Sequence, residues 1–329
     1  MGLSASEKLR RFYEHFSSND HVLTVINADP DAIASAMAVS RLLWHRITNN
    51  TISNINVVRR PDNLAMIRLL GVKLVHIDQI DESKFNRIIM VDSQPDHNEA
   101  FSRFIPDVII DHHPETNAKA SFMDIRPKYG ATATIMTEYL RAAKIKPSVK
   151  LATGLFLAIK TDTSNFERQT LMEDVRAFQF LFRNTNIHLA SKIEQAELTL
   201  DFLKYFKTAL QNKRMRKGRV FVHLGSVINP DVCVLVADFF MKVNSVMWTI
   251  ISGINDQKLI IVLRNDGIRK NAGKVAEMSF GHIGSAGGHK SMARAEISLS
   301  DIKNRVDHKD NKKLQQWIIR HIETRADKK

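Results

Sequence analysis

Short, β-rich apolar runs alternate with helical patterns along the first half of this chain. Residues 22–26 form a continuous apolar run typical of a buried strand, and residues 32–47 carry apolar side chains at helical spacing. Such alternation is typical of a parallel sheet whose strands are joined by crossover helices. We therefore predict an α/β fold with a mostly parallel sheet flanked by helices. Further strands are expected at residues 55–58, 74–77, 88–91 and 108–110, and further helices at 63–70, 131–143 and 149–160.

The second half of the chain predicts a separate, smaller α/β unit. Residues 170–215 have helical patterns with few turn signals and end in a basic run. Strand-like runs follow at 219–223, 246–252 and 259–263, and then come a helical stretch at 272–280 and a glycine-rich segment at 281–289. We expect a first domain at residues 1–190, a helical linker at 191–215 and a second domain at 216–329.

The chain of 329 residues carries a formal net charge of +13. A surface this basic favours polyanionic partners such as nucleic acid or polyphosphate. Basic residues gather at 213–217 and 303–329, although a solvated linker and tail would have the same composition. Charge alone therefore does not name a substrate.

Cysteine content and hydropathy bear on the location of the protein. Cys233 is the only cysteine, which excludes an internal disulfide and fits a reducing compartment. We find no run of eighteen or more apolar residues, so we predict no membrane partner. The first residues lack the apolar core of a secretory signal, and cytoplasm is the expected location.

Acidic side chains and imidazoles follow several of the predicted strands. Asp29 and Asp31 come after the run at 22–26, Asp92 follows the run at 88–91, and an Asp-His-His sequence follows the run at 108–110. Because ligands bind at the carboxyl ends of strands in open parallel sheets, these side chains are expected in one crevice. Each motif alone is also compatible with a turn or a helix cap. Because all of them follow predicted strands, a common binding site is favoured over separate turns and caps.

A cluster of carboxylates in a partly dry crevice is costly unless cations neutralise it. Carboxylate oxygens with a single imidazole suit Mn²⁺ or Mg²⁺ better than Zn²⁺. Two such ions can share a carboxylate and clamp a phosphate during in-line displacement. The glycine-rich segment adds backbone amides that can approach anionic oxygens closely.

Taken in order, these segments resemble the DHH phosphoesterase family, in the branch with a C-terminal DHHA1 domain. That branch includes RecJ-like exonucleases and NrnA-type oligoribonuclease/pAp phosphatases. The motifs that carry the resemblance are Asn27-Ala28-Asp29-Pro30-Asp31, Val91-Asp92-Ser93, Asp111-His112-His113, Thr161-Asp162-Thr163 and Gly287-Gly288-His289. The resemblance covers nearly the whole chain, so it implies a DHH catalytic domain followed by a DHHA1 substrate-binding domain.

The resemblance implies two metal ions, with Mn²⁺ expected and Mg²⁺ as the alternative. Asp29 and Asp92 would bind one ion, and Asp92 would bridge to the other. The second ion would be bound by Asp31, Asp92, His112 and Asp162. We expect these five metal ligands at the ends of core strands.

The remaining site residues follow from the same resemblance. Asp111 would orient His112 and fix its tautomer, and His113 would contact the substrate phosphate. Asp92, His112 and His113 are therefore the expected catalytic residues. In the second domain, Arg264 would grip phosphate because a guanidinium suits a bidentate contact. Gly287, Gly288 and His289 would close on the substrate.

One position departs from the family pattern. The first motif usually opens with a histidine four residues before its first aspartate, and here that position is Val25. Asn27 offers an amide oxygen nearby, which is a poorer ligand for a transition metal than imidazole. His45 or His76 is the alternative source of the missing ligand. The first ion is therefore expected to bind more weakly than the second.

The implied activity is hydrolysis of a phosphoester by water that the metals activate. The expected substrates are short single-stranded oligonucleotides or nucleotides, which would make the protein a Mn²⁺-dependent exonuclease or oligoribonuclease. An exopolyphosphatase or a cyclic-dinucleotide phosphodiesterase would share this chemistry. A degenerate, non-catalytic nucleotide- or RNA-binding protein is the alternative that Val25 keeps open. The oligomeric state is also open, and a homodimer is one outcome.

Overall fold

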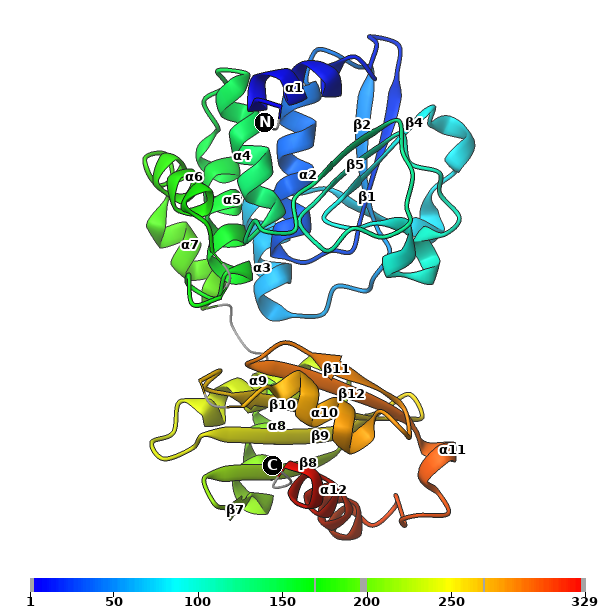
Figure 1. The fold of residues 1–329 in the computed structure, drawn as a ribbon, viewed down its shortest axis with the longest axis vertical. Helices are drawn as coiled ribbons and strands as arrows, with labels where there is room; N and C mark the ends of the chain where they lie inside the picture. The colour runs from blue at the N-terminus through cyan, green and yellow to red at the C-terminus, as the bar shows by residue number, and fades with distance from the viewer. Residues whose placement is uncertain (1–2, 169, 196–199, 269, 327–329) are drawn as a thin grey trace. The chain divides into compact units, whose positions relative to one another are not determined.

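A computed structural model of the chain describes residues 3–168, 170–195, 200–268 and 270–326 (Figure 1). The fold divides into two compact units, Met1–Glu197 and Leu198–Lys329. Each unit contains one six-stranded sheet with helices packed against it. None of the described helices combines the length and the apolar character that a membrane crossing requires.

The first unit is built on a sheet in which every strand pair is parallel, with the order β3-β2-β1-β4-β5-β6. This arrangement confirms the predicted α/β fold with a parallel sheet. The chain moves outward from β1 to β3 on one side and then restarts at β4 on the other. The strands are β1 (His21–Ile26), β2 (Asn49–Asn54), β3 (Leu74–His76), β4 (Arg87–Val91), β5 (Val108–Asp111) and β6 (Phe122–Ile125).

Helices cover one face of this sheet, with α2 at the centre against α4 and α5 (Figure 1). The apolar residues of this face form the large core of the unit, while a smaller cluster around Leu23, Met90 and Phe101 fills the opposite face. Both faces of the strands are thus buried, which explains their nearly continuous apolar runs. The helices are α1 (Ala5–Tyr13), α2 (Pro30–Leu43), α3 (Pro61–Leu70), α4 (Thr132–Ala142), α5 (Val149–Asp162), α6 (Met172–Phe182) and α7 (Ile187–Glu194).

The second unit has a mixed sheet with the order β11-β12-β10-β9-β8-β7. Only β8 and β9 pair in parallel, and the other neighbours are antiparallel. The cluster on one face includes residues of α8 and α9, and that on the other face includes residues of α10 and α12. The elements are α8 (Leu200–Asn212), β7 (Arg214–Arg216), β8 (Arg219–Ser226), α9 (Asp231–Met241), β9 (Trp248–Asn255), β10 (Lys258–Asn265), α10 (Ala272–Phe280), β11 (Ser285–Gly288), β12 (Met292–Ser298), α11 (Leu299–Ile302) and α12 (Asn311–Ala326).

Two sequence expectations about these elements are wrong. The strand expected at 55–58 lies instead at Asn49–Asn54, in a polar segment whose backbone pairs with β1 along six residues. The helix inside the expected linker, α8, packs into the core of the second unit through Phe202, Tyr205 and Ala209. Sequence periodicity identified that helix but not the unit to which its apolar face belongs.

Candidate metal centre

Asp29 and Asp31 lie at the start of α2, just after β1. The partly buried Asp29 carboxylate caps this helix by accepting a hydrogen bond from the Ala32 amide at 2.9 Å. Asp31 is fully buried, and its two oxygens accept from the amides of Thr132 and Ala133 at 2.6 and 2.8 Å. These amides belong to the first turn of α4, where a helix dipole favours negative charge. Asp31 is therefore held in place by the first turn of α2, to which it belongs, and by the first turn of α4, whose amides it contacts.

Asp92 directly follows β4 and has a left-handed backbone conformation, with φ 58°. Such a conformation is uncommon outside glycine and is often found where a side chain is held for function. The buried Asp92 carboxylate accepts a hydrogen bond from Thr132 Oγ1 at 2.8 Å. Thr132 thus holds Asp92 through its hydroxyl and Asp31 through its amide. Sequence reasoning missed Thr132, whose signal was a hydroxyl residue near the start of a predicted helix.

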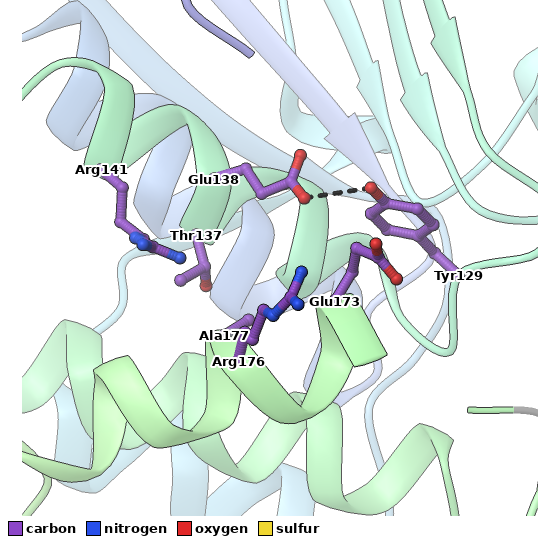
Figure 2. Close-up of a pocket in the computed structure, with 7 residues that line it drawn as sticks. All are labelled: Tyr129, Thr137, Glu138, Arg141, Glu173, Arg176 and Ala177. Carbon is purple, nitrogen blue, oxygen red and sulfur yellow. Dashed lines mark hydrogen bonds between the residues drawn. The ribbon is translucent and has the colours of Figure 1, made fainter. Parts of the chain in front are cut away.

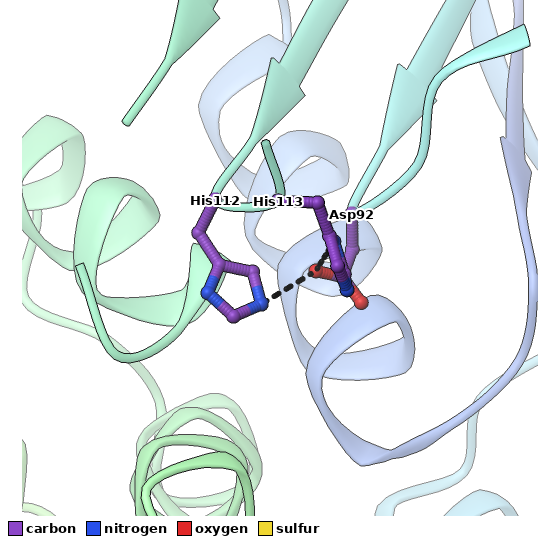
Figure 3. A group of neighbouring side chains, drawn as sticks. All are labelled: Asp92, His112 and His113. Atoms are coloured by element: carbon purple, nitrogen blue, oxygen red, sulfur yellow. Dashed lines mark ion pairs between the residues drawn. The ribbon is translucent and has the colours of Figure 1, made fainter. Parts of the chain in front are cut away.

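His112 lies after β5, and a backbone contact holds its ring on the side away from the carboxylates. Its Nδ1 atom is 3.1 Å from the carbonyl oxygen of Tyr129, and because a carbonyl only accepts, Nδ1 carries the proton. The opposite atom, Nε2, lies 3.3 Å from Asp162 Oδ2, 3.6 Å from Asp92 Oδ1 and 3.9 Å from Asp31 Oδ2. Nε2 is buried and forms no hydrogen bond with any described residue. Figure 3 shows this ring directed at the Asp92 carboxylate.

Asp162 is the last residue of α5, so the expectation that all five ligands follow strands is wrong for this one. The C-terminus of α5 nevertheless reaches the same edge of the sheet. Potential ligand atoms of Asp31, His112 and Asp162 lie within 4.8 Å of one another, as do those of Asp92, His112 and His113. The structure therefore gathers Asp31, Asp92, His112 and Asp162 in one cluster. Asp29 lies close enough for its charge to raise the pKa of Asp92, but it belongs to no described ligand group.

The cluster carries more negative charge than its surroundings neutralise. Burial, reinforced by the Asp162 charge, raises the pKa of Asp29 to about 6 and that of Asp31 to about 7. Burial and the charges of Asp31 and Asp29 raise the pKa of Asp92 well above its ordinary range. Burial opposes protonation of His112, yet Asp162 and Asp31 raise its pKa to about 9. Protons thus supply part of the positive charge that the site needs.

These observations fit a divalent cation bound by Asp31, Asp92, His112 and Asp162. The donors are carboxylate oxygens and one imidazole nitrogen, a set suited to Mn²⁺. The Tyr129 contact keeps a proton on Nδ1 of His112, so the proton that a cation would displace is the one on Nε2, which faces the three carboxylates. A cation at this position would replace the protons and relieve the repulsion among the carboxylates.

Asp111 holds His113 rather than the ring of His112, which corrects our expectation. Asp111 Oδ1 accepts from His113 Nδ1 at 2.8 Å and from the backbone amides of His112 and His113. Gln94 donates to the other oxygen of Asp111 at 2.6 Å. Because Nδ1 of His113 is engaged, its Nε2 atom remains for an external group, and the His113 side chain is 44% exposed. The Asp111 contact raises the pKa of His113.

The structure also locates the unusual position of the first motif. Val25 is fully buried in the apolar cluster on the face of the sheet opposite α2. Asn27 is exposed between β1 and α2. His45 stacks on Trp44, and His76 contacts Asp78 at the edge strand β3. Neither histidine joins a described ligand group.

His97 was missed by the sequence reasoning. Its ring centroid lies 5.3 Å from that of His113, and its Nδ1 accepts a hydrogen bond from the Gln94 amide. His97, Asp111 and His113 form a further group of potential ligand atoms within 4.8 Å of one another. A neutral His97 ring with the Gln94 contact carries its proton on Nε2, which suits an anionic oxygen better than a metal. The tight turn after β4 places it there, and the sequence signal was a histidine five residues after Asp92.

The predicted substrate contacts of the second unit lie at one end of its sheet. Arg264 is near the end of β10, where its Nε donates to Asp238 Oδ1 at 2.9 Å. Gly288 has φ +143°, and a Cβ there would lie 2.5 Å from the Met292 carbonyl oxygen. A Cβ at Gly287 would meet nothing within 4 Å. Backbone conformation and packing thus require glycine at 288 but leave the glycine at 287 unexplained.

A separate pocket of about 460 Å³ lies between α4 and α6 (Figure 2). Tyr129, Glu138 and Arg176 are among its lining residues, and the Tyr129 hydroxyl donates to Glu138 at 3.0 Å. The backbone of Tyr129 holds His112, but no aspartate of the metal cluster lines this pocket. The pocket therefore lies behind the segment that supports the cluster.

Comparison with known proteins agrees with this architecture. An uncharacterized protein of Methanocaldococcus jannaschii, MJ1633, is 34% identical over 314 residues. The match covers 95% of this chain, which spans 65% of the length of that relative. An exopolyphosphatase-related protein from Bacteroides fragilis has the same fold, with a TM-score of 0.74, 15% identity and coverage of 98% and 99% of the two chains.

RecJ from Thermus thermophilus, solved in complex with Mn²⁺, is also similar. Its TM-score is 0.53 at 11% identity, over 97% of this chain and 55% of RecJ. The sequence model of the DHH family, N-terminal domain, matches residues 21–159, which contain every strand of the first sheet and all proposed metal ligands except Asp162. Residues 21–159 of the chain therefore form a DHH family, N-terminal domain.

Proposed function

We propose that this chain is a metal-dependent phosphoesterase, a hydrolase acting on short single-stranded oligonucleotides or nucleotides. The observation that carries the proposal is the His112 Nε2 atom, which faces Asp31, Asp92 and Asp162 inside a cluster whose buried carboxylates repel one another. Mn²⁺ is the proposed ion, since the donor set suits it and the similar RecJ structure contains it. Mg²⁺ is the alternative.

A divalent ion here would lower the pKa of water and neutralise charge on a bound phosphate. The chain itself supplies positioning. Thr132 holds Asp31 and Asp92, and the Tyr129 carbonyl fixes the His112 ring, so little reorganisation accompanies binding. His113, held through Nδ1 by Asp111, presents Nε2 to a phosphate oxygen and can donate a proton there.

We further propose that Asp29 and Asp92 hold a second ion, and that this ion binds more weakly. The support is the buried Val25, which leaves Asp29 without the imidazole of the usual first motif. His97 does not replace it in the tautomer that its Gln94 contact favours. Two ions would share Asp92, whose carboxylate has one oxygen engaged by Thr132.

The second unit is proposed to be a DHHA1 substrate-binding domain. Its support is Gly287, where the absence of a side chain is explained neither by packing nor by a positive φ and would admit a phosphate. Arg264, Gly288 and His289 would complete the contact. Gly287→Ala should weaken substrate binding, measured as KM, about tenfold or more, whereas Gly288→Ala should instead lower the melting temperature because of its φ. Equal KM for wild type and Gly287→Ala would remove this support.

An exopolyphosphatase is the second candidate, because the fold matches an exopolyphosphatase-related protein and the net charge is +13. The test compares hydrolysis of a two- to five-nucleotide RNA, a nucleoside bisphosphate, a cyclic dinucleotide and polyphosphate, each with Mn²⁺ and with chelator. Asp92→Ala should be inactive, and Asp201→Ala, at an exposed position of α8, is the matched control. Absence of turnover of every substrate by the wild type would leave only a nucleotide-binding role.

A further inference from the structure

A cavity in the second unit lies apart from the residues proposed to touch substrate. It measures about 620 Å³, in the range of small-molecule sites, and is bounded by the end of α8, by β7 and β8 and by the start of α12. Lys213, Arg214 and Lys312 supply positive charge to its lining, and His223 of β8 is a buried member. The other lining residues are Gln211, Asn212, Asn311 and Gln315.

His223 is 2% exposed and is held in one tautomer. Its Nδ1 lies 3.0 Å from Ser252 Oγ, and that hydroxyl donates its own proton to the Val222 carbonyl oxygen. Nδ1 therefore carries the proton and Nε2 is an acceptor. Nε2 is buried and makes no hydrogen bond of ordinary geometry with a described residue, although the Asn311 side chain interacts with the ring. Burial lowers the pKa of His223 to about 4, a shift that Asn311 only partly opposes, so the ring stays neutral.

A buried acceptor without a donor is costly, and a ligand that brings an N–H or O–H group would satisfy it. The surrounding cations favour an anion as well. Lys213 uses one of its three ammonium protons on the Leu210 carbonyl oxygen, and the charge of Lys312 also acts on the Asp310 carboxylate just before α12. The matching ligand thus carries a negative charge and a neutral donor a few ångströms apart.

The cavity is distinct from the Arg264 site because the two lie on opposite faces of the second sheet. Arg264 contacts Asp238 of α9. His223 lies on the other face, with Ser252 beside it on β9, and the start of α12 lines the same cavity. Alternation along β8 explains this placement, since Phe221 packs in the cluster that includes α12 and Val222 in the cluster that includes α9.

We propose that this cavity binds a ribose phosphate unit, with the phosphate at Lys213, Arg214 and Lys312 and a ribose 2′-hydroxyl donating to His223 Nε2. Such a unit combines the two required groups, and its 2′-hydroxyl distinguishes RNA from DNA. The unit can come from an RNA chain or from a ribonucleotide. The site is an accessory one, separate from the metal cluster, and does not depend on turnover.

The test measures binding of labelled five-nucleotide RNA, its 2′-O-methyl form and the matching DNA to the full chain in EDTA. Wild type should bind RNA about twofold to tenfold more tightly than the other two, which is the range of one net hydrogen bond. His223→Leu should bind all three equally. Lys312→Ala and Arg214→Ala should weaken all three alike and lower the salt dependence by about one charge each.

Lys303→Ala is the matched control, since Lys303 is exposed in the same unit and does not line the cavity. Asp92→Ala should keep the preference for RNA while losing hydrolysis, so this proposal and the proposed function can fail separately. Displacement of RNA by AMP would identify a mononucleotide as the ligand, and failure of AMP to compete would identify an RNA chain.

Equal affinity of wild type for RNA and 2′-O-methyl RNA would overturn the proposal. Survival of the RNA preference in a folded His223→Leu variant would also overturn it. Should that variant not fold, two other measurements decide. Wild type must bind RNA more tightly than 2′-O-methyl RNA, and Lys312→Ala must weaken RNA binding more than Lys303→Ala does.

Discussion

Two histidines, one in each unit, both donate a hydrogen bond from Nδ1 to an oxygen and keep Nε2 buried, but their pKa values shift in opposite directions. His112 donates from Nδ1 to the Tyr129 carbonyl oxygen, and His223 donates from Nδ1 to the Ser252 hydroxyl. Both leave a buried Nε2 atom that makes no hydrogen bond of ordinary geometry with a described residue. Yet the pKa of His112 is raised to about 9 and that of His223 is lowered to about 4.

Their surroundings explain the difference. Three carboxylates face Nε2 of His112, so a proton or a cation is favoured there. Nε2 of His223 has no carboxylate near it in the described structure, and burial alone then disfavours the charged ring. One imidazole is therefore suited to a metal, and the other to a neutral donor. The hydrogen bond at Nδ1 fixes the tautomer of each ring, and the presence or absence of carboxylates near Nε2 determines whether that atom favours a cation or a neutral donor.

The largest expected effect comes from removing one charge of the acidic cluster. Asp92→Asn should reduce Mn²⁺-dependent hydrolysis by more than about 100-fold, since even groups that only support a metal ligand cost 10–100-fold. The stabilisation by added Mn²⁺, read as the shift of melting temperature, should also disappear.

The same variant should be more stable than wild type when metal is absent at pH 8, because it relieves the repulsion among Asp29, Asp31 and Asp92. Asp201→Asn is the exposed control and should change neither Mn²⁺-dependent hydrolysis nor the melting temperature. A metal-free Asp92→Asn protein that melts below wild type would contradict the charge argument.

A smaller effect should separate the two adjacent histidines of the first unit. Asp111→Asn weakens the support of His113 but leaves the Tyr129 contact of His112 intact, so kcat should fall about 10–100-fold. Mn²⁺ affinity, measured by titration calorimetry, should change less than threefold. A matching loss of metal affinity would mean that Asp111 supports His112 after all.

A pH series tests the raised pKa of His112 directly. Its folded value of about 9 lies above the ordinary value of 6.5, so its contribution to stability is fully present below pH 6.5 and is lost as the pH rises through 9. The metal-free chain should therefore become easier to unfold with urea between pH 7 and pH 9. His112→Gln should flatten that slope, and a slope equal to that of wild type would show that another group titrates.

The smallest effect is expected at His223, whose contribution to stability changes with pH in the direction opposite to that of His112. Its folded pKa of about 4 lies below 6.5, so its contribution is present above pH 6.5 and is lost as the pH falls through 4. In a Trp44→Phe background, the remaining Trp248 and Trp317 report on the second unit. Acid unfolding followed by their fluorescence should be less steep with His223→Leu. An unchanged midpoint and slope would place His223 outside the acid transition.

Much of the first unit was predictable because its strands are buried on both faces. The runs ending at Ile26, Val91 and Ile110 lie within observed strands, because a strand buried on both faces has a nearly continuous apolar run. The polar strand β2 was not predictable in this way. Its residues are fixed by backbone pairing with β1, which leaves no apolar pattern to detect.

The family motifs, the alternation of strand and helix, and the convergence of Asp29, Asp31, Asp92 and His112 at one sheet edge all follow from the amino-acid order. Parallel strands make that convergence unavoidable, because their carboxyl ends share an edge. What holds each side chain became visible only in the folded chain. Thr132, Tyr129 and Ser252 contribute hydrogen bonds across 17 to 101 residues of chain, and no local pattern records such partners. Those contacts leave Nε2 of His112 ready for a cation and Nε2 of His223 ready for a hydroxyl.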